Sequence, residues 1–91
     1  MSDRDAGLPS HQLLALVSQI LIKNSIARQV SVDDQLTEIG LSSIDMVNLM
    51  LAIEAEFDIM IPASEITPAN FRSISTIEGL IIRMKSQVAR R

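Results

Sequence analysis

Two adjacent hydroxyl side chains, Ser42 and Ser43, follow Gly40 at the point where a loop is predicted to meet a helix. The first turn of a helix leaves backbone N–H groups unpaired, and the helix dipole adds positive potential there. A phosphodiester anion is stabilised at such a position. Gly40 permits a tight turn and leaves the serines open to a modifying enzyme. The pattern therefore favours a phosphate-linked group on one of these hydroxyls.

The helix that carries these serines is the best-defined element of the sequence. Ser42 is a candidate N-cap, and Asp45 three residues later completes a pair like the capping box, with Asp in place of the usual Glu. Ile44, Val47 and Leu51 share one side of this helix, but apolar residues cover more than one stripe. The pattern predicts a helix that is packed on most sides or keeps an apolar strip free for a partner.

The segment before this helix is predicted to contain one helix and one long loop. Apolar residues at helical spacing predict a first helix over 11–27, with Ser10 as a plausible N-cap. A loop over Gln29–Leu41 follows, and a loop of this length in a small domain is often functional. We expect the loop to be pinned to the core by its apolar residues, Val30, Val32, Leu36 and Ile39.

The segment after it is predicted to form two more helices. A short helix is expected near 68–73, with Thr67 as its N-cap. The last helix is expected to start at Ser75, where Glu78 completes a Ser-x-x-Glu capping box. The sequence thus predicts an all-α fold, a four-helix bundle with a long loop between helices 1 and 2 and a short third helix. The predicted divisions are a flexible leader over 1–9, a folded domain over 10–88 and a basic tail over 89–91.

Composition and charge exclude several functional classes. The chain has 91 residues with no Cys and one His, which argues against disulfides, thiolate metal sites and an enzyme with a cysteine or paired-histidine centre. Between Gln29 and Phe71 there are eight acidic residues and no Lys or Arg, which favours basic partners and repels nucleic acid. Apolar runs are too short to span a bilayer, and the N-terminus does not resemble a signal peptide, so a cytoplasmic protein is expected.

The region from Asp33 to Ile82 resembles the acyl carrier protein family, which includes peptidyl and aminoacyl carriers. That family has Gly-x-Asp-Ser-Leu at the start of its second helix, then an acidic amphipathic helix, a Phe and an Ile-Pro. The matching residues here are Gly40-Leu41-Ser42-Ser43-Ile44, Val47, Leu51, the run from Ile53 to Ile59, Ile61-Pro62 and Ser75-Thr76-Ile77-Glu78. The short Gly-x-x-Ser core alone is weak, but its combination with the downstream spacing is specific.

The resemblance implies that Ser43 is esterified with 4′-phosphopantetheine, whose terminal thiol holds cargo as a thioester. Its neighbours Gly40, Leu41, Ser42 and Ile44 would form the site around this covalent cofactor. Ser42 stands where the family usually has Asp, and Ile44 stands where it usually has Leu. The chain would then be a non-enzymatic carrier that presents an acyl or aminoacyl group to biosynthetic enzymes.

The same resemblance implies a surface for partner enzymes on the second helix. The partners would be a phosphopantetheinyl transferase, a cargo-loading ligase or acyltransferase and a downstream acyl-accepting enzyme, with the carrier a monomer that binds neither nucleic acid nor membrane. Asn48 and Ala55 lie where many fatty-acid carriers have acids, so we expect a less acidic and more apolar surface. The predicted docking residues are Asp45, Met46, Leu49, Met50, Glu54 and Glu56, with Ile44 as an apolar contact.

The cargo is predicted to be a small amino acid or short acyl group rather than a long chain. The reasons are the less acidic helix, the likeness of Leu41–Ser43 and Asn70–Phe71 to stand-alone aminoacyl carriers, and bulky residues at expected core positions. Those positions include Leu13, Leu16, Ile20, Val47, Leu51, Ile77, Leu80 and Ile81. An unmodified helical interaction module, in which Ser42 and Ser43 serve only as capping residues, is the alternative.

Overall fold

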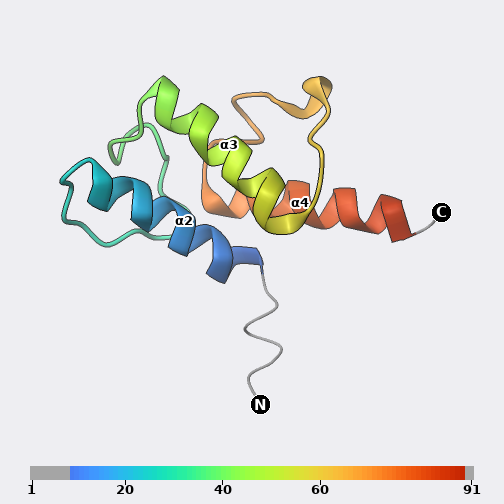
Figure 1. The fold of residues 1–91 in the computed structure, drawn as a ribbon, viewed down its shortest axis with the longest axis horizontal. Helices are drawn as coiled ribbons and strands as arrows, with labels where there is room; N and C mark the ends of the chain where they lie inside the picture. The colour runs from blue at the N-terminus through green and yellow to red at the C-terminus, as the bar shows by residue number, and fades with distance from the viewer. Residues whose placement is uncertain (1–8, 90–91) are drawn as a thin grey trace, which may run out of the picture.

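The described residues form three α-helices packed around one apolar core (Figure 1). A computed structural model of the chain describes residues 9–89, with side chains through residue 86. The helices are α2 (Pro9–Lys23), α3 (Ser43–Phe57) and α4 (Ile74–Ala89), and a 3₁₀ helix, η1, covers Ala63–Glu65. No strand occurs in the described part of the chain, and the predicted all-α class is confirmed.

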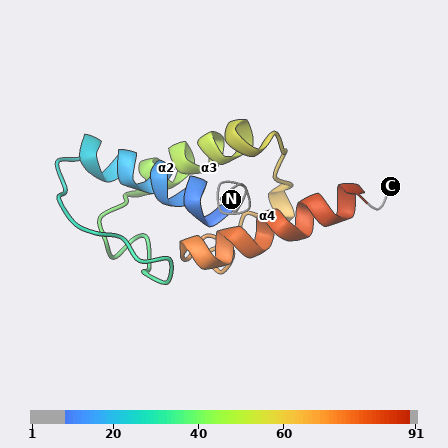
Figure 2. The ribbon, with the colours of Figure 1, turned by 90° about the horizontal axis from the view of Figure 1, so that it is seen from below.

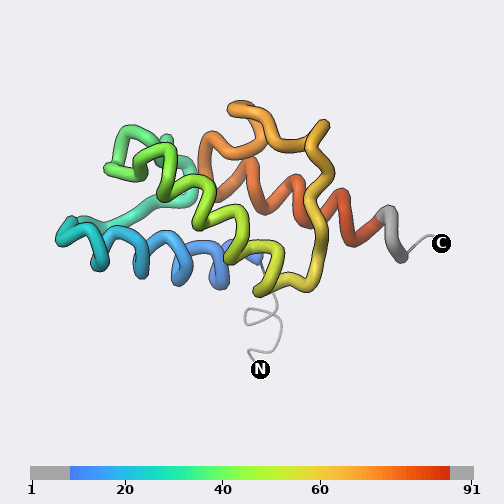
Figure 3. The backbone as a smooth tube through the Cα atoms, turned by 45° about the horizontal axis from the view of Figure 1, so that its top comes forward, coloured from blue at the N-terminus to red at the C-terminus, as the bar shows by residue number. Residues whose placement is uncertain are grey.

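Helix α2 lies at the centre of the packing, because it contacts both α3 and α4. Figures 2 and 3 show α2 alongside α3, while α4 lies along a different side of α2. Each helix turns one apolar stripe inward at spacings of three and four residues, which is the pattern of a helix buried on one face. The buried stripes consist of Leu13, Val17 and Leu21 in α2, Leu49, Ile53 and Phe57 in α3, and Ile74, Ile77, Leu80 and Ile81 in α4.

Helix α2 ends at Lys23, four residues before the predicted end at residue 27. Ser25 adopts a left-handed backbone conformation, with φ of 62°. The Ser25 N–H donates to the Ile22 carbonyl at 2.9 Å, and the Ile26 N–H donates to the Leu21 carbonyl at 2.8 Å. These two bonds form the Schellman arrangement that closes a helix C-terminus. The prediction was wrong here because a Ser, and not the usual Gly, occupies the left-handed position.

The long loop between α2 and α3 is pinned to the domain, as predicted. Leu36 and Ile39 are buried, and Val30 and Val32 pack against the core from partly buried positions. Two backbone hydrogen bonds tie the loop to the start of α4: the Leu36 N–H donates to the Arg72 carbonyl, and the Ser75 N–H donates to the Val32 carbonyl, both at 2.9 Å. The loop is therefore a fixed part of the structure that leads into α3.

The predicted short helix near 68–73 is not an α-helix. Asn70 N–H donates to Thr67 Oγ1 and Phe71 N–H to the Thr67 carbonyl, which makes a single turn. The turn does not continue, because the Asn70 carbonyl accepts from Thr76 Oγ1 and the Arg72 carbonyl accepts from the loop. The short helical element is instead η1, which follows Pro62, so the described residues hold three α-helices and one 3₁₀ helix where four helices were predicted.

The start of α4 also differs from its prediction. The Thr76 N–H donates to Ser73 Oγ at 3.3 Å, and the Ser73 N–H donates to Thr76 Oγ1 at 3.1 Å. This reciprocal pair closes the N-terminus two residues earlier than the predicted Ser75–Glu78 pair. Ser75 has a different role, because its hydroxyl donates to Asp33 Oδ1 at 2.8 Å and so fastens the long loop.

Among the described residues, no helix is long and apolar enough to cross a membrane. Most of the predicted leader over 1–9 and of the basic tail over 89–91 lies outside the described residues, which begin at Pro9 and end at Ala89. These two boundaries, and the domain over 10–88 between them, stay predictions.

Two leucines of α3 offer a matched test of this packing. Leu49 is 0% exposed and Leu51 is 56% exposed. We expect Leu49→Ala to lower the free energy of unfolding by about 2–5 kcal/mol, because it removes buried methyl groups and leaves a cavity. Leu51→Ala should change it by less than about 1 kcal/mol. Urea unfolding followed by circular dichroism measures both, and equal losses in the two variants would contradict the assigned orientation of α3.

Candidate functional site

A reciprocal hydrogen-bonded cap closes the N-terminus of α3, as the sequence predicts. Ser42 is the N-cap in extended conformation, and its Oγ accepts a hydrogen bond from the Asp45 N–H at 3.2 Å. In return, Asp45 Oδ2 accepts from the Ser42 N–H at 2.9 Å. The Ser42 hydroxyl therefore already serves the helix, where such a cap typically contributes about 0.5–2 kcal/mol.

Ser43 is the first residue of α3, and its side chain is exposed. Neither its hydroxyl nor the backbone N–H groups of Ser43 and Ile44 form a hydrogen bond within the described part of the chain. A phosphodiester on Ser43 Oγ would lie beside these free N–H groups, at the positive end of the helix dipole. The residues present therefore fit a phosphate-linked group on Ser43.

The turn that leads into the cap needs a glycine. Gly40 has φ of 122°, which side-chain-bearing residues rarely adopt, and a Cβ built there would lie 2.5 Å from Ile26 Cδ1. Leu41 next to it is buried in the core, whereas Ser42, Ser43 and Ile44 are exposed. The chain thus passes from an anchored leucine directly to the exposed serines.

Asp45 joins the start of α3 to the end of α2. Its Oδ2 accepts a second hydrogen bond from Asn24 Nδ2 at 2.9 Å. The pKa of the Asp45 carboxyl is lowered, chiefly because the carboxylate accepts a hydrogen bond from the Ser42 backbone N–H. Desolvation raises this pKa, whereas the Asn24 and Ser42 side chains and the Lys23 charge lower it further. The carboxylate stays ionised and fixed beside Ser43, with Oδ2 directed at the cap.

The predicted docking residues differ in how exposed they are and in the hydrogen bonds that they already form. Glu56 is exposed and Asp45 is half-buried in the cap, while Glu54 Oε2 accepts from the Ile61 N–H at 2.9 Å. Glu54 is therefore committed to holding the segment after α3. Met46 and Met50 are half-buried.

For Leu49 the docking prediction was wrong, because its side chain lies in the core. Conversely, Val47 and Leu51, predicted as core residues, are 50% and 56% exposed. Together with Ile44, which is 73% exposed, they form the exposed apolar strip of α3. Helical spacing fits two apolar stripes on this helix, and the sequence analysis assigned the exposed stripe to the core.

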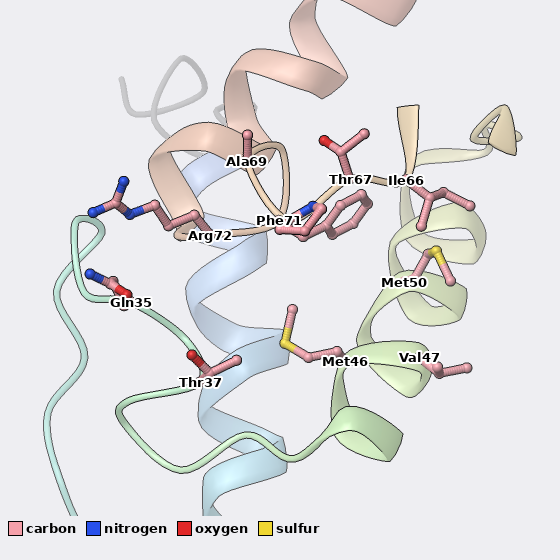
Figure 4. Close-up of a pocket in the computed structure, with 11 residues that line it drawn as sticks. Gln35, Thr37, Met46, Val47, Met50, Ile66, Thr67, Ala69, Phe71 and Arg72 are labelled. Carbon is pink, nitrogen blue, oxygen red and sulfur yellow. The ribbon is translucent and has the colours of Figure 1, made fainter. Parts of the chain in front are cut away.

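An open groove of about 580 Å³ runs along α3 (Figure 4). Met46, Val47 and Met50 line it from α3, and Figure 4 shows Phe71 and Ile66 across from them. Gln35, Thr37 and Arg72 provide polar groups at its end toward the long loop. The groove was not predicted, because it depends on the path of 66–72, a segment that overlaps the helix predicted near 68–73.

Comparison with known proteins identifies the family. A family model described as the phosphopantetheine attachment site matches residues 11–81. The chain belongs to this family of phosphopantetheine carriers. The carrier is 49% identical over 72 residues to aminoacyl carrier protein 1 of Bradyrhizobium diazoefficiens, a match that covers 79% of this chain and 80% of the relative. It is 46% identical over 72 residues to aminoacyl carrier protein 2 of the same organism, which covers 79% and 81%.

Solved structures agree with this result. The carrier matches a chain in the crystal structure of Bradyrhizobium japonicum glycine:[carrier protein] ligase complexed with glycylated carrier protein, with a TM-score of 0.69 and 49% identity over 78% of this chain and 96% of that chain. A second structure of that ligase, complexed with cognate carrier protein and an analogue of glycyl adenylate, gives a TM-score of 0.71 and 47% identity over 81% and 96%.

Membership defines the activity of the carrier. It is a non-enzymatic protein that holds an acyl or aminoacyl group as a thioester on a covalent 4′-phosphopantetheine arm and presents it to biosynthetic enzymes. The arm supplies the thiol, which a chain without Cys does not itself contain. The residues of the carrier supply exposed serine hydroxyls at a fixed helix start.

The lowered pKa of Asp45 gives a pH dependence of stability. Because the folded carboxyl has a pKa below the ordinary value of 3.8, its contribution is present above that value and is lost as pH falls through the lowered pKa. The stability difference between the parent and Asp45→Asn should therefore be largest at neutral pH and shrink in acid. Urea unfolding across the acid range measures it, and a difference that does not change with pH would contradict this role.

Proposed function

We propose that Ser43 carries the arm and that the cargo is a small amino acid loaded by a dedicated ligase. The observation that supports the attachment point is the contrast between two neighbouring hydroxyls. Ser42 Oγ accepts the Asp45 N–H in the cap, whereas the exposed Ser43 hydroxyl has no hydrogen bond among the described residues. A hydroxyl that is free and exposed can enter the active site of a transferase without breaking the helix.

The neighbours of Ser43 have separate roles in this proposal. Gly40 forms the turn, buried Leu41 anchors it, and Ser42 caps the helix. Exposed Ile44 offers an apolar contact to the enzymes that approach the arm. None of these four residues is proposed to bond covalently with the cofactor.

The proposed cargo rests on the relatives and not on the core. Both relatives are named aminoacyl carrier proteins, and the similar solved chain occurs in a complex of a glycine ligase with glycylated carrier protein. We therefore propose glycine or a similarly small amino acid. The argument from a dense core is weaker than the sequence suggested, because Val47 and Leu51 lie outside it and an open groove adjoins α3.

The partners in this proposal are a phosphopantetheinyl transferase, the ligase and a downstream acyl-accepting enzyme. The carrier acts as a cytoplasmic monomer, with no nucleic acid or membrane partner. We propose that these enzymes dock on α3 through Ile44, Val47 and Leu51 together with Met46, Met50, Asp45 and Glu56. Glu54 contributes less, because its carboxylate is occupied by the Ile61 N–H.

The attachment point is tested by intact mass after incubation with coenzyme A and a phosphopantetheinyl transferase. The parent should gain the mass of one phosphopantetheine, Ser43→Ala should gain none, and Ser42→Ala should still gain it. Because Ser43 does not cap the helix, Ser43→Ala should keep the circular dichroism spectrum of the parent. Modification of Ser43→Ala would move the site, and an unmodified parent would favour the alternative, an interaction module without an arm.

The cargo is tested by charging the modified carrier with a glycine:[carrier protein] ligase, ATP and radiolabelled glycine. We expect one glycine per arm, released by hydroxylamine as a thioester is, and no label on Ser43→Ala. Label that resists hydroxylamine, or efficient charging by a long-chain acyl ligase in place of the glycine ligase, would contradict the proposal.

The same charging assay separates apolar from ionic docking. Exposed ion pairs contribute about 0–1 kcal/mol each and are screened by salt. Leu51→Ala should therefore slow charging more than Glu56→Gln, because Leu51 offers apolar area that a partner can bury. Charging that depends steeply on salt and is insensitive to Leu51→Ala would argue for ionic docking.

A further inference from the structure

The turn that ends α2 touches residues 40–45, the segment that contains Ser43, at two points. Asn24 Nδ2 donates to Asp45 Oδ2 at 2.9 Å, behind the cap of α3. Ile26 lies against Gly40 so closely that a Cβ on Gly40 would be 2.5 Å from Ile26 Cδ1. These two contacts lie on either side of Ser43 in the sequence, and both come from one turn of chain.

Backbone hydrogen bonds hold the end of α2 in place. The Asn24 N–H bonds to the carbonyls of Ile20 and Leu21 at 3.0 and 3.1 Å, and Ser25 and Ile26 close the Schellman arrangement. Left-handed Ser25 turns the chain between the two contacting residues. The backbone of Asn24 is therefore fixed by α2 and not by residues 40–45.

We propose that Asn24 is a positioning residue for the attachment of phosphopantetheine to Ser43. It fixes the Asp45 carboxylate, and through it the start of α3 and Ser43, against the end of α2. This inference rests on the proposed attachment at Ser43. Asn24 acts through Asp45 and does not touch the reacting atoms.

The step that it serves is the transfer of phosphopantetheine from coenzyme A. The Ser43 Oγ–phosphorus bond forms, and the phosphorus–oxygen bond to adenosine 3′,5′-bisphosphate breaks. The serine proton passes to a base of the transferase. Such a transfer is sensitive to the placement of the attacking oxygen. Loss of the Asn24 bond would loosen that placement while leaving the exposed apolar strip of α3, Ile44, Val47 and Leu51, unchanged.

The experiment measures transferase kinetics on the full chain with Asn24→Ala and with Asn24→Asp, which keeps the size but cannot donate to a carboxylate. We expect kcat to fall about two- to tenfold, the equivalent of one ordinary hydrogen bond, with little change in KM for the carrier. Exchange of the Ser42 amide hydrogen should become faster in both variants, because that amide bonds to the Asp45 oxygen that Asn24 holds.

The chain supplies a matched control at the other end of the same helix pair. Gln12 Nε2 donates to Glu56 Oε2 at 3.1 Å, which is also a side-chain bond between α2 and α3. Gln12→Ala should leave kcat and Ser42 exchange at parental values. Equal slowing by Gln12→Ala, or parental kcat in both Asn24 variants, would overturn the inference while leaving the attachment at Ser43 intact. An unmodified parent would instead remove the proposed function, and the inference with it.

Discussion

One oxygen atom, Oδ2 of Asp45, holds the start of α3. It accepts hydrogen bonds from the Ser42 backbone and from the Asn24 side chain, both at 2.9 Å. The first bond closes the helix N-terminus, and the second joins that terminus to α2. Because Ser42 and Asp45 complete the cap between them, Ser43 is not required to stabilise the helix. Ser43 therefore stands in the first turn without a structural duty, which is what the proposed attachment of the arm requires.

Helix α3 divides its apolar residues between the core and the surface. Leu49, Ile53 and Phe57 fix it in the core, whereas the exposed apolar strip of Ile44, Val47 and Leu51 points away. Its three acids all accept hydrogen bonds within the domain: Asp45 in the cap, Glu54 from the Ile61 N–H and exposed Glu56 from Gln12 Nε2. Fewer of its carboxylates are free than the number of acidic residues suggests, and for this reason the proposed docking relies mainly on apolar contact.

The features that the sequence predicted are those determined locally. The Ser42–Asp45 cap requires only residues three apart, and Leu36 and Ile39 are apolar positions in a polar loop, which have few alternatives to burial. The errors arose where tertiary contacts chose between local options. Two serines, Ser73 and Ser75, each precede a suitable partner at the start of α4. Asp33, distant in sequence, binds the Ser75 hydroxyl and leaves the cap to Ser73.

The same explanation holds for the faces of α3. Apolar residues surround much of this helix, so its periodicity fits more than one orientation, and tertiary packing, chiefly against α2, decides which stripe is buried. The groove beside α3 and the Asn24–Asp45 bond join segments far apart in the sequence. No local pattern in the chain encodes either of them.

The contacts at the base of the long loop have a practical consequence for engineering. Asn24 meets Asp45 and Ile26 meets Gly40, so the two ends of the loop are joined to each other independently of the residues between them. Ala27, Arg28 and Gln29 are exposed just beyond this junction. Lengthening a loop whose ends are already held together costs little entropy. A peptide tag inserted there, or a fluorescent label attached there, would therefore leave the positions of Gly40 and Asp45 unchanged.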